Sequence, residues 1–309
     1  MVQEKKNGAT AGLTDDVDLI RFDWAMKTIL RNKANFDVLE GFLSALLRED
    51  VEVLELLESE GNQTTFISKY NRVDLLVKDS HNRKIIIEIQ NNREADYFER
   101  VVYGASQKIV ESVELDGSYK GISKVISISI LYYNLGKGDD YIYYGTTEMK
   151  GLNTGTPWIV REKDIGLLKA ETEPYVLIEK DIFPEYYFIN IMKFNDVINK
   201  DADEWIYFFK NNKILDSFHS RNIQIAKKKF DLLKMSPKER KTYDNYLSDL
   251  MIENDVINTS KSDGIIIGLK QGREETKIET AINSIKLGLD SDIISKITGL
   301  TVEEIDKLR

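Results

Sequence analysis

The sequence contains no cysteine and only two histidines, His81 and His219, among its 309 residues. A chain without cysteine forms no disulfide, no thiolate metal site and no cysteine nucleophile, and this composition suits a reducing cytoplasm. Two histidines also argue against a histidine-built zinc site and against a Ser-His-Asp triad. These absences exclude the thiol and zinc classes of site.

Long apolar runs are missing as well. The longest run, residues 125–133, is short and interrupted by serine, so it does not reach the length that spans a bilayer. The polar N-terminus carries no signal-peptide pattern. We therefore expect a cytoplasmic protein without a membrane partner.

Excess positive charge is the third absence, because the formal net charge is −9. This balance argues against a protein that coats nucleic acid, since phosphate binding needs positive charge. It does not exclude a nuclease, whose metal site is itself acidic and whose DNA contact can come from a local basic face. Residues 221–241 are a candidate for such a face, although a solvated helix surface is the simpler interpretation. Their basic side chains include Lys227, Lys228, Lys229, Lys234, Lys238, Arg240 and Lys241.

The pattern along the chain predicts four segments. Residues 1–17 are polar and contain glycine, which is typical of a disordered tail. Residues 18–195 show a helix, two or three strands, a helix and two more strands, which predicts an α/β core with helices packed on a mixed sheet. Residues 196–262 carry helical patterns without strand signals. Residues 263–309 form a C-terminal helical module that closes with a capping box at 301–304.

Two short apolar runs each carry an acidic residue, and they are the most informative part of the sequence. Residues 72–77 and 84–90 are predicted to be paired strands separated by a polar turn. Because strand residues point alternately to the two faces of a sheet, pairing brings Asp74, Glu88 and Gln90 to one spot. Two carboxylates with a hydrogen-bonding neighbour can hold a hard divalent cation.

The isoleucines beside Glu88 indicate that its carboxylate is buried. A buried, unpaired carboxylate costs several kcal/mol, so a metal, a cation or a pKa shift must offset that cost. A salt bridge to Arg72 or Arg93 is the alternative to a metal site. The sequence pattern alone leaves both interpretations open.

Two predicted helices carry further candidate residues. Glu40 lies at the margin of an apolar helix stripe over residues 36–47, where it either points toward the carboxylates or has a capping or solvent role. Arg100 lies on a helix predicted over residues 94–115. It either contacts a phosphate at the site or belongs to an ordinary helix flank.

An ordered set of short segments extends along most of the chain. It is strongest at Asp74 and at residues 87–90, Ile-Glu-Ile-Gln. The other segments are residues 22–27, 40–47, Arg100, 103–106, 125–128, 268–272 and 297–305. With these segments the chain resembles the PD-(D/E)XK nuclease family transposases, also called the recombination-promoting nuclease family.

The resemblance implies a restriction-endonuclease-like core and cleavage of DNA phosphodiesters that depends on Mg²⁺, with Mn²⁺ as a substitute. It also implies a bacterial protein linked to transposition or recombination. Asp74 and Glu88 match the metal-binding acids of the family. Gln90 matches a position that is lysine in most of the wider superfamily, and glutamine can orient a group but brings no positive charge.

A mechanism follows from this resemblance as a hypothesis. The carboxylates of Asp74 and Glu88 and the backbone carbonyl of Ile89 hold the metal, with Glu40 as an added ligand through a water. Gln90 orients the attacking water. The missing charge then comes from Lys27, from Arg100 or from a second metal.

The sequence therefore predicts a metal-dependent endonuclease that acts on double-stranded DNA. Cutting both strands needs two such sites, which favours a homodimer formed through the C-terminal helices. The alternative is a nuclease-fold protein that no longer cuts and serves as a DNA-binding or protein-interaction module. The acidic net charge and the absent lysine favour that alternative.

Overall fold

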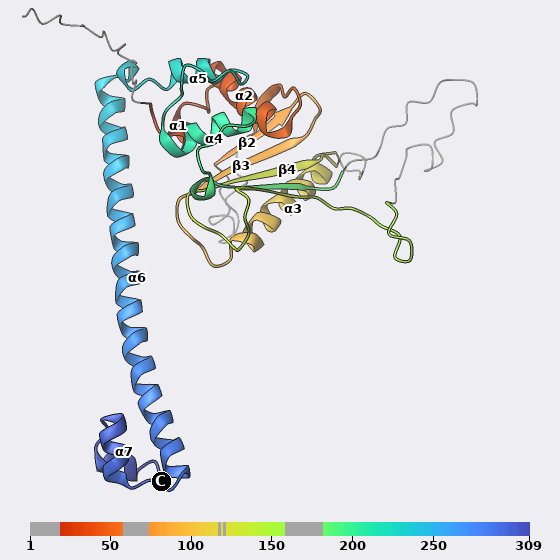
Figure 1. Ribbon diagram of the computed structural model, residues 1–309. Helices are drawn as coiled ribbons and strands as arrows, with labels where there is room; N and C mark the ends of the chain where they lie inside the picture. Colours follow the sequence, from red (N-terminus) through yellow and green to blue (C-terminus); the bar gives the residue numbers. More distant parts are fainter. Residues whose placement is uncertain (1–18, 58–73, 117–118, 120–121, 158–181) are drawn as a thin grey trace, which may run out of the picture. The chain divides into compact units, whose positions relative to one another are not determined.

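The computed structural model describes residues 19–57, 74–116, 119, 122–157 and 182–309 (Figure 1). The predicted tail, residues 1–17, lies outside the described residues. The chain divides into two compact units, Met1–Ser236 and Pro237–Arg309. This division falls within the predicted helical extension, residues 196–262, whose limits stay a prediction.

The first unit is built on a six-stranded sheet with the strand order β1-β2-β3-β4-β6-β5. The pairs β3–β4 and β4–β6 are parallel, whereas the pairs β1–β2, β2–β3 and β5–β6 are antiparallel. The predicted α/β fold with a mixed sheet is therefore confirmed. The strands are β1 (Val53–Leu57), β2 (Leu75–Asp79), β3 (Lys84–Gln90), β4 (Val125–Leu131), β5 (Ile142–Gly145) and β6 (Glu185–Asn190).

Helices flank this sheet on both sides (Figure 1). One face carries α3 (Tyr97–Asp116), the helix predicted at residues 94–115. The other helices of the unit gather on the opposite side. They are α1 (Phe22–Thr28), α2 (Phe36–Leu47), α4 (Asp201–Asn211) and α5 (Ile223–Lys229), with short 3₁₀ turns η1 (Lys33–Asn35), η5 (Ile191–Lys193) and η6 (Leu232–Lys234).

The alternation along β3 decides which side chains meet α3. Ile86 is buried with Leu76 of β2 against Ala105 of α3. Ile85 and Ile87 point to the other face and are fully buried there. Because Glu88 is two residues after Ile86, its side chain lies on the same face of the sheet and points toward α3.

Aromatic side chains fill the opposite layer. The Phe22 ring of α1 stacks on Phe209 of α4 with ring centroids 4.0 Å apart, and it meets Phe42 of α2 edge-on at 6.0 Å. Trp205 and Phe208 of α4 are also fully buried. Such rings bury large apolar areas, so this cluster fixes α1, α2 and α4 against one another.

Gly41 of α2 allows a close approach between α2 and residues near α4 and α5. A Cβ at this position would overlap the carbonyl oxygen of Arg221 and lie 2.8 Å from the Trp205 ring. We expect Gly41→Ala to lower the free energy of unfolding by about 1–3 kcal/mol, because backbone must move to admit the methyl group. Gly104→Ala on α3 is the matched control, since its Cβ would meet nothing within 4 Å. Urea unfolding of both variants tests this, and equal midpoints would contradict it.

The second unit contains α6 (Pro237–Lys286), α7 (Ser291–Thr298) and α8 (Val302–Asp306). Ala281 of α6 packs with Ile294, Leu300 and Ile305 in a small core. The predicted capping box is confirmed, because the Thr301 hydroxyl accepts from the Glu304 amide and Glu304 accepts from the Thr301 amide. Helix α6 is continuous through residues 262 and 263, where the sequence pattern suggested the start of a module.

Strand β6 was not predicted from the sequence. It lies between β4 and β5 and runs parallel to β4. The strands β4 and β5, which follow one another in sequence, are therefore not neighbours in the sheet. Tyr186, Tyr187 and Phe188 give β6 its aromatic character. Its place in the sheet depends on a long connection, which local patterns do not encode.

Candidate functional site

Asp74 and Glu88 come together where β2 and β3 pair. Leu75 lies opposite Ile87, and Leu76 lies opposite Ile86, so the antiparallel register confirms the predicted pairing. The Ile89 amide donates a 2.7 Å hydrogen bond to Oδ2 of Asp74, the residue just before β2. This bond fixes the Asp74 carboxylate beside the strand residue that follows Glu88.

The Glu88 carboxyl group is buried and strongly perturbed. Its side chain is 14% exposed. Burial raises the pKa of Glu88 to about 7; the positive charge of Arg100 opposes this rise, while the negative charges of Asp74 and Glu94 add to it. Within the described part of the chain, Oε2 of Glu88 has no hydrogen-bond partner. Perturbed carboxyl groups of this kind are concentrated at functional sites.

Arg100 of α3 is the cation nearest to this carboxyl group in the described structure. Its Nη2 lies 3.9 Å from Oε2 of Glu88, a distance that makes a loose ion pair and not a hydrogen bond. Its guanidinium also lies over the Tyr97 ring, 5.2 Å from the centroid. The salt-bridge partner of Glu88 is thus Arg100, whereas the sequence suggested Arg93 or Arg72; Arg72 lies outside the described residues.

Gln90 is held on both sides of its amide. Its Nε2 donates to Oε1 of Glu94, and its Oε1 accepts a 3.1 Å bond from Nη2 of Arg100. Nη1 of Arg100 donates to Oε2 of Glu94 at 2.5 Å. Glu94 and Arg100 therefore fix the orientation of the Gln90 amide. Glu94 was not predicted as a site residue, although its position four residues after Gln90 places it near the end of the same strand.

The remaining predicted residues have different surroundings. Oε1 of Glu40 accepts a 3.0 Å bond from the Val53 amide, and Oε2 lies 3.9 Å from Nη2 of Arg221. These contacts join the middle of α2 to the first residue of β1 and to Arg221, and they are not those of a helix cap. Lys27 belongs to α1, and its side chain lies outside the described part of the structure. The Ile89 side chain is buried, and metal binding by its carbonyl stays a prediction.

The donor set around Glu88 suits Mg²⁺. Among the described residues, no three histidine or acidic side chains form a cluster able to hold a metal ion. Mg²⁺ does not need such a cluster, since it keeps several waters and commonly binds through one or two carboxylates. Asp74 and Glu88 provide these two carboxylates, and Oε2 of Glu88 is a buried acceptor without a donor.

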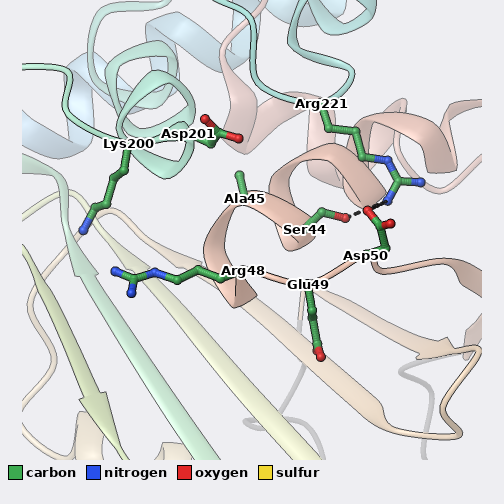
Figure 2. A pocket seen from close by; sticks show the side chains of 8 residues that line it. All are labelled: Ser44, Ala45, Arg48, Glu49, Asp50, Lys200, Asp201 and Arg221. Atoms are coloured by element: carbon green, nitrogen blue, oxygen red, sulfur yellow. Dashed lines mark hydrogen bonds and ion pairs between the residues drawn. The ribbon is translucent and has the colours of Figure 1, made fainter.

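Two hollows lie elsewhere in the first unit, with volumes of about 470 and 340 Å³. Both are lined by Arg48 and Lys200, which extend to the same side of the larger hollow in Figure 2. In that hollow Arg221 donates to Asp50 at 3.3 Å. Neither hollow is lined by Glu88, so cavity size does not mark the carboxylate site.

The basic stretch near α5 is partly neutralised. Nζ of Lys227 lies 2.7 Å from Asp216, and Nζ of Lys229 lies 2.6 Å from Asp37. Arg240 lies 3.2 Å from Asp244, so three of the seven basic side chains have carboxylate partners in the described structure, as on a solvated helix surface. None of the described helices combines the length and the apolar character that a membrane crossing requires.

Comparison with known families gives one match. Residues 20–155 match the model of the PD-(D/E)XK nuclease family transposase. The matched range includes Asp74, Glu88, Gln90 and Arg100 and ends before β6. Neither a curated protein nor a solved structure matches the chain significantly. The matched family is one of nucleases with a role in transposition, and PD-(D/E)XK nucleases typically use a divalent metal.

Proposed function

From the premise that residues 20–155 form a PD-(D/E)XK nuclease family transposase domain, we propose that the protein is a Mg²⁺-dependent DNA endonuclease. The observation that carries this proposal is the buried Glu88 carboxyl group beside Asp74, with one oxygen that has no hydrogen-bond partner in the described structure. Double-stranded DNA is the proposed substrate, and Mn²⁺ is a proposed substitute for Mg²⁺. A bacterial, cytoplasmic protein linked to transposition or recombination completes the proposal.

Asp74 and Glu88, with the Ile89 carbonyl, are the proposed ligands of the metal. When bound, Mg²⁺ polarises a phosphoryl oxygen and lowers the pKa of a coordinated water. The Ile89 amide already orients Asp74 through Oδ2. Glu88 must lose its proton to act as a ligand, and a pKa of about 7 means that this loss occurs near neutral pH.

Gln90 and Arg100 are proposed to divide the work of the lysine that the wider superfamily has at position 90. The Gln90 amide, fixed by Glu94 and Arg100, orients the attacking water through a hydrogen bond. Arg100 brings the positive charge, and its place 3.9 Å from Glu88 supports this role. A guanidinium also suits the planar, bidentate recognition of a phosphate.

The chemical test is the nicking of supercoiled plasmid by the full chain. We expect nicked and linear DNA in the presence of Mg²⁺ and none in the presence of EDTA. Asp74→Asn keeps the size of the side chain but removes its charge, so it should abolish most of the activity. If wild type and Asp74→Asn cleave the plasmid equally, both with Mg²⁺ and with EDTA, a contaminating nuclease made the cuts and the proposed activity is contradicted.

The inactive DNA-binding or interaction module has one specific observation in its favour. The Gln90 amide already donates one hydrogen bond to Glu94 and accepts one from Arg100, so only its second N–H and one lone pair are left for water in the described arrangement. A relic of this kind needs no metal. Calorimetric titration of the metal-free protein with Mn²⁺ separates the two functions, because only the nuclease requires binding.

A homodimer is proposed because a duplex cut needs two sites. The C-terminal unit supports this, since α6 exposes large apolar side chains, among them Ile265, Ile266 and Leu269. Exposed apolar surface of this kind is typical of interaction sites. Sedimentation equilibrium tests the proposal, and the mass of a single 35.6 kDa chain at micromolar concentration would contradict it.

A further inference from the structure

Buried polar atoms without hydrogen-bond partners surround Glu88 on the face that α3 covers. Within the described residues they include Oε2 of Glu88, the hydroxyls of Tyr97 and Ser129, and Nε of Arg100. An unsatisfied buried polar group costs about 1–3 kcal/mol. Four such atoms from β3, β4 and α3 in one place call for a common explanation.

Ser129 is the neighbour of Glu88 in the sheet. In the parallel pairing of β3 with β4, Ser129 lies directly opposite Glu88, so both side chains point toward α3. Ser129 is 1% exposed, and its hydroxyl can turn toward any acceptor within reach. The Glu88 carboxyl group is the buried acceptor that this register places beside it.

Tyr97 reaches the same place from the first turn of α3. Its side chain is 1% exposed, and the Arg100 guanidinium that lies 3.9 Å from Glu88 also lies 5.2 Å from the Tyr97 ring centroid. Burial raises the pKa of the Tyr97 phenol, the negative charge of Glu88 raises it further, and the neighbouring Ser129 hydroxyl opposes the rise. The Tyr97 hydroxyl, which interacts electrostatically with Glu88, is thus able to act as a hydrogen-bond donor close to Glu88 and Ser129.

We propose that Tyr97 and Ser129 are positioning residues for Glu88. Their hydroxyls donate hydrogen bonds, directly or through one ordered water, to Oε2 of the ionised Glu88 carboxylate. Oε1 is then the oxygen directed toward a divalent cation. This inference rests on the proposed function, because it assigns Glu88 the role of a metal ligand.

Electrostatics favours donors at this place once Glu88 is charged. Arg100 at 3.9 Å neutralises the carboxylate but gives it no hydrogen bond. Bonds from a donor to a charged acceptor are about twice as strong as neutral ones, so two hydroxyls satisfy an ion that Arg100 leaves unsatisfied. Partners that orient a ligating carboxylate commonly change metal affinity about 10–100-fold.

The test is calorimetric titration of the metal-free full chain with Mn²⁺ at pH 8. We expect Ser129→Ala and Tyr97→Phe each to weaken Mn²⁺ binding about tenfold or more, whereas Ser129→Thr, which keeps the hydroxyl, retains the wild-type affinity. Ser127→Ala is the matched control, because Ser127 lies on the same face of β4 opposite Ile86. Tyr186→Phe is the second control. Burial, and not the charge of Glu88, raises the pKa of the Tyr186 phenol, so this substitution removes a phenol hydroxyl that does not act on Glu88.

The outcomes separate the two proposals. If the wild-type protein binds Mn²⁺ and both Ser129→Ala and Tyr97→Phe bind it equally well, the positioning role is wrong while the metal site stands. If the wild type binds no Mn²⁺, the metal site and the positioning role both fall. Urea unfolding of each variant accompanies the titration, and Ser129→Ala decides the matter if Tyr97→Phe does not fold.

Discussion

Replacement of Glu88 by glutamine is expected to lower Mg²⁺-dependent plasmid nicking about a thousandfold. Glutamine has nearly the shape of glutamate but cannot bring the negative charge that binds a hard cation. Loss of the metal removes several kcal/mol of transition-state stabilisation, and about 4 kcal/mol corresponds to a factor of a thousand in rate. The initial rate of conversion from supercoiled to nicked plasmid at pH 8 measures the effect.

A matched control comes from the same part of the molecule. Glu99 lies in the first turn of α3 and is exposed. Glu99→Gln removes the same charge without touching the Glu88 site, so its nicking rate should stay within about twofold of wild type. A Glu88→Gln protein that nicks plasmid as fast as Glu99→Gln would remove Glu88 from the mechanism.

Glu88→Gln is also expected to stabilise the metal-free protein by about 3 kcal/mol at pH 8. The pKa of Glu88 rises from 4.5 to about 7 on folding, a difference of about 2.5 pH units at about 1.4 kcal/mol each. Below pH 4.5 both states hold the proton. Between pH 4.5 and 7 the unfolded state loses it while the folded state keeps it, so the stability of wild type falls as pH rises.

Glu88→Gln cannot titrate at this position, so its stability should lack that fall. Urea unfolding in EDTA at pH 5 and at pH 8, followed by tryptophan fluorescence, measures the difference. Trp24 and Trp205 are both buried in the first unit and report on it directly. Identical pH dependence of wild type and Glu88→Gln would mean that Glu88 is not perturbed by burial.

The two expected results have one physical origin. A carboxyl group held among isoleucines and beside a second carboxylate destabilises the fold when it is charged. A bound cation reverses that cost, and adding Mg²⁺ at pH 8 should therefore stabilise wild type more than Glu88→Gln. Loss of function with a gain in stability is the usual mark of a residue that is kept for its chemistry.

The pairing of β2 with β3 was predictable because it depends on local patterns. Residues 84–90 alternate with a period of two, the turn between the strands is short and polar, and antiparallel neighbours in sequence commonly pair. These facts place Glu88 and Gln90 on one face, and the observed register agrees. The positions of α2, α3 and β4 followed from periodicity in the same way, although α3 begins at Tyr97 and not at residue 94 as predicted.

The residues that surround Glu88 were harder to predict from the sequence. Arg100 was one of several candidate cations, and only the packing of α3 on the sheet shows that it contacts both Gln90 and Glu88. Ser129 lies 41 residues from Glu88 in sequence, and a parallel register across a helical connection decides that they are neighbours. Glu40 was predicted near the carboxylates as one option, and its contacts with Val53 and Arg221 instead join α2 to the start of β1.

The sequence by itself determined the α/β class, the acidic strand pair and the absence of thiol chemistry, because alternation, composition and short turns act over a few residues. The tertiary structure decided which cation meets Glu88, where β6 enters the sheet and which hydroxyls lie beside the buried carboxyl group. These features join residues that are far apart along the chain. Their contacts are fixed by the packing of whole strands and helices, and no local pattern carries that information.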